Sequence, residues 1–157
     1  MNKQKHLEIP TILADILHKS CCRKRVGEWK SISLGFGEKV FHTKKTIDSF
    51  YGEWEVGTYS SNWEIYQDNK LLFSSKEMEI TKIELDVKIQ DLFIGYIEEI
   101  KLINDGLDVK LILNNNIDIV FYAIKDEEDT EVVHFFAPNN IYIEFHSKIG
   151  WVVENSI

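Results

Sequence analysis

Apolar and polar residues alternate along much of the chain after residue 29, as they do in half-buried β-strands. Side chains of a strand point alternately to its two faces, so each such segment can turn one apolar face toward a core. The first segments with this pattern are 31–36, 54–58, 63–65 and 71–73. We therefore expect strands at these positions.

Short turns connect the later strands of this group, at Ser60-Ser61 and at Asp68-Asn69. A turn at Ser60-Ser61 sets Thr58 opposite Trp63 and places apolar side chains of both strands on one face. The sequence therefore predicts a three-stranded meander in which each strand pairs with the next one along the chain.

The clearest hairpins lie in the second half of the chain. Asp105-Gly106 is typical of a two-residue hairpin turn, and this turn sets Leu102 opposite Val109. Residues 114–116 are all Asn, which tolerates the left-handed backbone of a tight loop. That loop sets Val109 opposite Phe121. One face of the resulting second meander is almost wholly apolar.

The C-terminal region predicts one more hairpin. Its strands cover 132–137 and 141–145, around a turn at 138–140, and a short final strand follows at 151–153.

A helix is predicted near the N-terminus, from Thr11 to about Cys21, with Thr11 as its N-cap. Its apolar stripe consists of Ile12, Leu13, Ile16 and Leu17. Four cations gather at its expected C-terminal end, namely Lys19, Arg23, Lys24 and Arg25. We interpret them as complementing the helix dipole. Contact with an anion or an acidic partner is the alternative.

The segment 81–92 has the features of both a strand and a helix. Its apolar residues alternate with polar ones, which favours a strand. However, Thr81 and Glu84 have the spacing of a capping box, and Gly95 stands where a helix would stop. We predict a helix here.

These elements define an α+β fold in a single domain, 1–157, with mostly antiparallel strands. The fold comprises two meanders, a C-terminal hairpin, the N-terminal helix and one helix between the meanders. We expect the strands to pack as one continuous or two-layered sheet. The predicted core consists of Leu102, Val109, Leu111, Ile119, Phe121 and Ile143.

The charge of the chain is uneven. The formal net charge is −8, with ten Lys/Arg and five Asp/Glu in residues 1–50, and eight and twenty-one in residues 51–157. Such an acidic surface repels phosphates, which argues against a nucleic acid as partner, and it attracts a basic protein. The most acidic stretch is a loop that contains Asp126, Glu127, Glu128, Asp129 and Glu131. This loop is either merely solvated or the contact patch for such a partner.

The cysteines and the hydropathy pattern predict where in the cell the protein is located. The chain has no run of the ~20 apolar residues that a membrane span needs, and no apolar signal core follows its first lysines. Cys21 and Cys22 are adjacent and have no second pair with which to bind zinc. A disulfide between them would be strained. We expect reduced thiols, a cytoplasmic location, no membrane contact and no cofactor.

The last hairpin brings three candidates for chemistry to one face. His134 lies opposite Glu144, and His146 follows two residues later on the same side. Two imidazoles and a carboxylate can bind a metal ion or transfer protons. A cross-strand His–Glu pair on a half-polar outer face is the simpler interpretation, and we favour it. The chain has neither a P-loop nor a nucleophile elbow.

Several short motifs between about residues 50 and 152 resemble those of a class of small bacterial proteins, some of which are immunity proteins of toxin systems. The motifs are Asn62-Trp63-Glu64-Ile65, Leu71 to Ser75, Ile94-Gly95, Leu107-Asp108-Val109, 114–116, Phe136-Ala137-Pro138-Asn139 and Gly150-Trp151. They are core and turn residues, so the resemblance implies no catalytic residue. It leaves residues 1–50 unexplained.

Three functions follow as hypotheses. The leading one is a protein-binding module, in particular an immunity or inhibitor protein that neutralises a basic toxin. Exposed Trp and Tyr side chains would anchor such a partner. The first alternative is a metal-dependent or acid–base enzyme that uses His134, Glu144 and His146. The second is a small-ligand binder built on a curved sheet.

Overall fold

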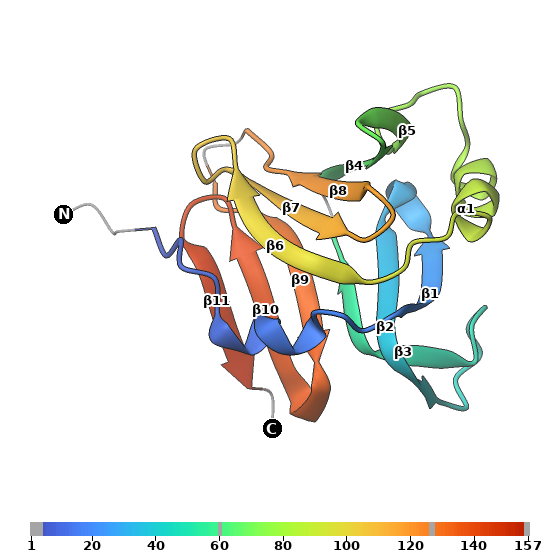
Figure 1. Cartoon of the computed structure of the whole chain (residues 1–157), viewed down its shortest axis with the longest axis horizontal. Coiled ribbons are helices and arrows are strands. Elements are labelled where there is room, and N and C mark those ends of the chain that lie inside the picture. The colour runs from blue at the N-terminus through green and yellow to red at the C-terminus, as the bar shows by residue number, and fades with distance from the viewer. Residues whose placement is uncertain (1–4, 60, 126–127, 156–157) are drawn as a thin grey trace.

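The structure of the protein is a computed structural model, and it describes residues 5–59, 61–125 and 128–155. Within these ranges the strands form two antiparallel sheets (Figure 1). Sheet A contains, in spatial order, β1 (Cys21–Val26), β2 (Ile32–Phe41), β3 (Phe50–Gly57), β9 (Glu131–Ala137), β10 (Ile141–His146) and β11 (Gly150–Asn155). Sheet B contains β5 (Lys70–Ser74), β4 (Asn62–Gln67), β8 (Ile117–Tyr122), β7 (Asp108–Leu113) and β6 (Ile97–Ile103).

Helical segments are few and short. They are the 3₁₀ turns η1 (Thr11–Ile16), η2 (Glu28–Lys30) and η3 (Pro138–Asn140), and the α-helix α1 (Lys82–Gln90). The prediction of a mostly antiparallel fold is confirmed, and the two-layered form of the sheet is the one observed. Among the described residues, no helix is both long enough and apolar enough to cross a membrane.

The two sheets share one hydrophobic core, which fills the space between them. Its largest side chains are Trp54, Trp63, Phe36, Phe121, Phe135 and Phe145. The core predicted from the sequence is part of it: Leu102 is partly buried against the core, and the other five residues are buried.

The predicted hairpins of sheet B have the predicted register. Leu102 pairs with Val109, and Val109 pairs with Phe121. The central turn residues Asp105 and Gly106 have positive φ, 57° and 79°, as the Asp-Gly signal indicates. The C-terminal hairpin is confirmed as well, and β11 adds the expected final strand.

The helix predicted over 81–92 is confirmed as α1. The Thr81 side chain accepts a hydrogen bond of 3.1 Å from the Glu84 backbone N–H, so the predicted N-cap is formed. The helix covers the free edge of β1, where Asp86 accepts a hydrogen bond of 2.8 Å from the Val26 N–H. Burial of Leu85 and Ile89 joins this helix to the core.

The helix predicted over 11–21 forms only as the 3₁₀ turn η1, and its N-cap is Pro10, not the predicted Thr11. η1 ends at Ile16, His18 takes a left-handed φ of 68°, and β1 begins at Cys21. The strand prevails because pairing with β2 satisfies the backbone of 21–26. The apolar stripe is partly right, since Leu13 and Ile16 are buried.

This difference also corrects the interpretation of the basic residues. Arg23, Lys24 and Arg25 stand on β1, so they do not complement the dipole of the helix predicted over 11–21. Arg23 and Arg25 instead form ion pairs with carboxylates of other elements. The Lys24 Nζ donates a hydrogen bond of 2.8 Å to the Gln90 carbonyl at the end of α1.

The meander predicted over 54–73 is also wrong in part. The Asp68-Asn69 turn does join β4 to β5, but β3 does not pair with β4. β3 lies between β2 and β9 of sheet A, and the connection after it carries the chain to sheet B. Ser61 fixes this crossing, because its Oγ donates a hydrogen bond of 3.0 Å to the Glu131 carbonyl on β9.

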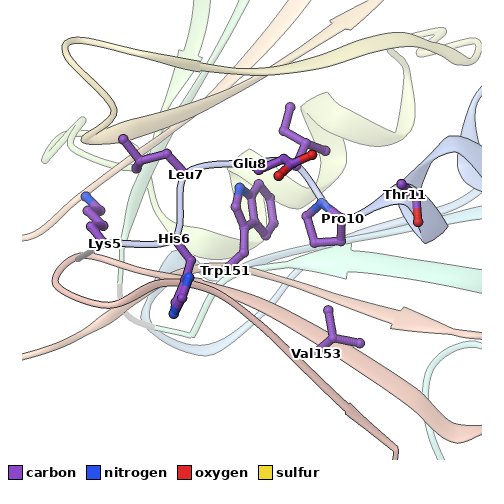
Figure 2. A pocket seen from close by; sticks show the side chains of 9 residues that line it. Lys5, His6, Leu7, Glu8, Pro10, Thr11, Trp151 and Val153 are labelled. Atoms are coloured by element: carbon purple, nitrogen blue, oxygen red, sulfur yellow. The ribbon is translucent and has the colours of Figure 1, made fainter. Parts of the chain in front are cut away.

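The N-terminal segment 5–10 crosses the end of sheet A as a strap. His6 donates to the Ile149 carbonyl at 3.0 Å and accepts from the Trp151 N–H at 2.9 Å, which is one step of parallel pairing. Figure 2 shows Trp151 beside this strap, with Pro10 and Val153 further along the cleft of about 720 Å³ between them. The strap therefore lies against β11 and lines this cleft together with Trp151 and Val153.

Candidate functional site

The outward side chains of sheet A form two rows that cross its strands. The first row is Arg25, Ser33, Gly57, His134, Glu144 and Val152, and the second is Arg23, Gly35, Glu55, Phe136, Tyr142 and Glu154. The predicted pairing of His134 with Glu144 is therefore present. These rows are mostly polar, but several of their members are buried because loops lie over them.

His134 is the most buried histidine of this face, with 6% of its surface exposed. Its Nδ1 lies 2.6 Å from Oε1 of Glu131, at the start of the same strand. A carboxylate can only accept, so the neutral ring carries its proton on Nδ1. Nε2 is then left as an acceptor, on the side of the ring nearest Gly57.

Gly57 leaves the space beside that nitrogen open. A Cβ built on it would stand 3.4 Å from Nε2 of His134 and would collide with the Ile32 carbonyl. A side chain at this position would therefore displace the strand and crowd the imidazole.

Aromatic rings enclose the imidazole. Tyr59 stacks on it with a centroid distance of 4.4 Å, and Phe136 lies 5.0 Å away on the other side. Tyr142 stacks in turn on Phe136 at 4.8 Å. Tyr59 and Phe136 remain 63% and 42% exposed, so they form a rim that a partner can touch.

The electrostatic potential at this face is negative. Burial raises the pKa of Tyr142, and the charges of Glu144 and Glu131 raise it further. Burial and the same two carboxylates also raise the pKa of Tyr59. Anionic tyrosinate is disfavoured here by the charges that would favour a bound cation.

An ion-pair network forms the other half of the face. Arg23 donates from Nε to Oε1 of Glu55 at 3.0 Å, and its Nη1 lies 3.2 Å from Asp48. Asp48 belongs to the loop between β2 and β3, and it also pairs with Arg25 at 2.9 Å. The two arginines thus hold this loop down on β1. Burial disfavours the Asp48 carboxylate, but hydrogen bonds from Arg25 and Arg23 outweigh it, so the pKa of Asp48 is lowered.

The folded loop and the turn after β9 enclose a cleft of about 720 Å³, which lies within the size range of ligand sites. Its floor contains Arg23, Ser33, Glu55 and His134, and its rim contains Tyr51, Phe136 and Asn139. Both oxygens of the Glu55 carboxylate accept hydrogen bonds, because Oε2 also accepts the Gly52 N–H at 2.7 Å.

His146 lies beside these groups but points to a different partner. Its Nε2 is 3.5 Å from Oε1 of Glu144, and its Nδ1 is 2.9 Å from Asp129, without hydrogen-bond geometry at Nδ1. His134 is turned toward Glu131 instead. Across the described ranges, no three His, Cys, Asp or Glu residues are grouped as a metal ion would require.

Two residues of the predicted acidic patch make contacts within the fold. Asp129 accepts the Lys148 and Ile149 N–H groups at 2.7 and 3.3 Å, and so holds the turn before β11. Glu131 binds His134 and accepts the Tyr59 N–H at 3.3 Å. Glu128 is exposed. Asp126 and Glu127 lie outside the described residues.

The sequence identified His134 and Glu144, but it did not connect His134 with Glu131 or with Arg23 and Glu55. Glu131 and His134 are three residues apart on one strand, so strict alternation places them on opposite faces. The irregular register between Phe145 and His146 brings them together. Arg23 was expected at the C-terminal end of a helix, and this expectation did not place it beside this face.

No family model, curated protein or solved structure matches this chain.

Proposed function

We propose that this protein is a protein-binding module and that the aromatic rim around His134, beside the cleft on the outer face of sheet A, receives a cationic side chain of a basic partner. The observation that carries the proposal is the acidic aromatic enclosure around His134. Tyr59, Phe136 and Tyr142 supply π faces, and Glu131 and Glu144 supply the negative field. Lys or Arg is the side chain that such an enclosure favours.

The cations already present on this face do not oppose that assignment. Arg23 is neutralised by Glu55 and Asp48. Lys44, at the rim of the cleft, lies 5.9 Å from the Tyr51 ring centroid, so an ammonium already rests on an aromatic face there. The net charge of −8 adds long-range attraction for a basic partner.

The finer form of the proposal is an inhibitor of the immunity-protein type, which covers and neutralises a basic toxin. It is supported by the acidic charge and by the exposed rings at the cleft rim. The structure shows Cys21 and Cys22 as free thiols, which supports a reducing, cytoplasmic setting for that role.

A capture experiment with matched variants tests the site. The protein is immobilised, exposed to lysate of its source cells and eluted with a salt gradient. Phe136→Ala and Glu144→Gln should each lose a basic polypeptide that the wild type retains in stoichiometric amount. Phe93→Ala and Glu99→Gln, which remove an exposed ring and an exposed charge elsewhere, should retain it. Equal retention by all four variants would contradict the assignment.

A defined probe tests the chemistry independently of the partner. N-acetyl-arginine amide should shift the amide resonances of residues 131–136 and 142–144 in a saturable manner. The uncharged N-acetyl-norleucine amide should shift them much less. Similar shifts with both probes, or none with either, would contradict cation recognition.

Acid–base chemistry is a second candidate, because the 2.6 Å contact between Glu131 and His134 leaves Nε2 as an acceptor at an open cleft. Hydrolysis of p-nitrophenyl acetate tests it. A catalytic imidazole should exceed the rate of free imidazole, and Glu131→Gln should change the pH profile of that rate. A rate equal to that of free imidazole, unaffected by Glu131→Gln, would dismiss this candidate.

A further inference from the structure

A second cleft, of about 640 Å³, lies beside the β10–β11 turn. It is formed where the chain leaves β5, β8 and β10 and where β6 turns into β7. Three lysines line it, and each comes from a different connection: Lys76 follows β5, Lys125 follows β8, and Lys148 follows β10.

The concentration of positive charge is unusual for this part of the chain. Residues 51–157 contain only eight Lys/Arg among twenty-one Asp/Glu, and three of those eight line this one cleft. In the described part of the chain, Lys19, Lys82 and Lys110 each pair with a carboxylate, whereas the three cleft lysines do not. The three ammonium groups repel one another, and Asp108 is the one carboxylate among the residues that line the cleft, so an anion between the lysines would be stabilised.

The carboxylates near the cleft are occupied by other groups. Asp108 lines its floor and is 8% exposed. One of its oxygens accepts the Ala123 N–H at 2.7 Å, and the other accepts the Asn104 amide at 2.6 Å. Asp129, behind Lys148, is held by two backbone N–H groups and lies beside His146.

Lys76 is also held in place. Its Nζ lies 4.7 Å from the centroid of the Tyr122 ring, whose hydroxyl lies 3.3 Å from that of Tyr66. Burial disfavours the Glu64 carboxylate, but hydrogen bonds from Tyr122, Tyr66 and Ser74, with a smaller contribution from the charge of Lys76, lower its pKa. All three lysines are exposed, but Lys76 rests on an aromatic ring, whereas no such ring contact holds Lys125 or Lys148 among the described residues.

We propose that this cleft is a binding site for a phosphate group, with Lys76, Lys125 and Lys148 as the residues that contact its oxygens. Lysine ammonium groups bind phosphate as point charges, and an open cleft with three of them suits a small, multiply charged oxyanion. The site shares no residue with the cleft around His134. The phosphate can be inorganic or the terminal group of a nucleotide.

Binding is measured by isothermal titration and by thermal shift at constant ionic strength, with sodium chloride as the reference salt. The probes are inorganic phosphate, pyrophosphate and adenosine diphosphate. We expect saturable binding, tighter for pyrophosphate than for phosphate because it carries more charge. If adenosine diphosphate binds more tightly than pyrophosphate, the source is a nucleotide; if it binds equally or less tightly, the source is the inorganic ion. Absence of saturable binding for all three probes would overturn the proposal.

A pair of double variants separates a site from general electrostatic attraction. Lys125→Gln with Lys148→Gln should weaken pyrophosphate binding by about tenfold or more, since two charge-assisted contacts are lost. Lys70→Gln with Lys101→Gln makes the same change of net charge at exposed positions of sheet B and should leave the affinity within about twofold. Equal weakening by both pairs would overturn the proposal.

Discussion

Trp63 on β4 donates a hydrogen bond from its indole N–H to the carbonyl of Lys30, 2.7 Å away in the turn between β1 and β2. This bond joins the two sheets, because β4 belongs to sheet B and the turn belongs to sheet A. It also supports an unusual backbone, since Trp29 and Lys30 both have positive φ, 57° and 55°. Trp151, in contrast, is buried without a hydrogen-bond acceptor among the described residues.

The two tryptophans should respond differently to the same change. Trp63→Phe leaves the Lys30 carbonyl without its partner and should lower the free energy of unfolding by about 1–3 kcal/mol more than Trp151→Phe. Each variant removes a comparable amount of apolar surface, so the difference isolates the hydrogen bond. Urea denaturation of both variants measures it. Equal losses of unfolding free energy would show that this hydrogen bond makes no net contribution to stability.

The link between Asp86 and β1 predicts a second difference. Asp86 accepts the Val26 N–H and pairs with Arg25 at 2.9 Å, so it fastens α1 to the sheet edge. Asp86→Ala should lower the free energy of unfolding by about 1–3 kcal/mol, because a partly buried donor and a cation lose their acceptor. Asp91→Ala, at the exposed end of the same helix, should change it by less than about 0.5 kcal/mol. Thermal and urea unfolding of the two variants measures both losses of stability, and equal losses would contradict this role of Asp86.

Gly95 and Gly27 differ in backbone conformation, so the same Gly→Ala substitution should affect stability differently at the two positions. Gly95 has a φ of +79°, and a Cβ there would collide with the Asn114 side chain, which accepts the Tyr96 N–H at 2.8 Å. Gly27 has a φ of −113°, and its nearest neighbour would be 3.8 Å from an added Cβ. We expect Gly95→Ala to cost more than about 1 kcal/mol of stability and Gly27→Ala to cost little or to stabilise. The order of their melting temperatures tests this.

The lowered pKa of Asp48 predicts a pH dependence of stability. A carboxyl whose pKa is lower in the folded than in the unfolded chain stabilises the fold above its ordinary pKa of 3.8. That stabilisation is lost as the pH falls below this value and the carboxyl becomes protonated. Asp48→Asn should therefore be less stable than the wild type at pH 7, and the gap should narrow toward pH 3. A constant gap in urea midpoints across this range would contradict the assignment.

Burial of β1 should make its thiols slow to react. Burial is the main cause that raises the pKa of Cys21 to about 12, and burial together with Glu55 raises that of Cys22. The thiolate is the reactive form, so a Cys22→Ser variant, which retains Cys21, should react with Ellman's reagent at pH 8 far more slowly than in 6 M urea. A Cys21→Ser variant serves as the comparison, and immediate native reaction of Cys21 would contradict the prediction.

Elements fixed by neighbouring residues were predictable from the sequence. The Asp105-Gly106 turn and the Asn residues at 114–116 determine the registers of β6, β7 and β8, because a short turn leaves the strands no other alignment. The Thr81–Glu84 capping box correctly decided an ambiguous segment in favour of a helix. In each case the decisive groups lie within a few residues of one another.

Features that depend on distant residues were missed. The sequence gives no local reason for β3 to pair with β9 in place of β4, since both choices bury Trp54 and Val56. The same holds for β1, whose Cys21-Cys22 start resembles a helix end until β2 is present to pair with it. The contact between Glu131 and His134 depends on an irregularity in pairing, which no alternation of residues indicates.

The order of strands also has a consequence for synthesis on the ribosome. Sheet B is built from one continuous stretch of chain, β4 to β8, whereas sheet A combines the first three strands with the last three. As the chain emerges, β3 presents an unpaired edge until all of sheet B and then β9 have been made. Sheet B can assemble early, but its apolar inner face has no partner layer until the C-terminal strands arrive. Nascent chains of intermediate length should therefore be the species that most need a chaperone.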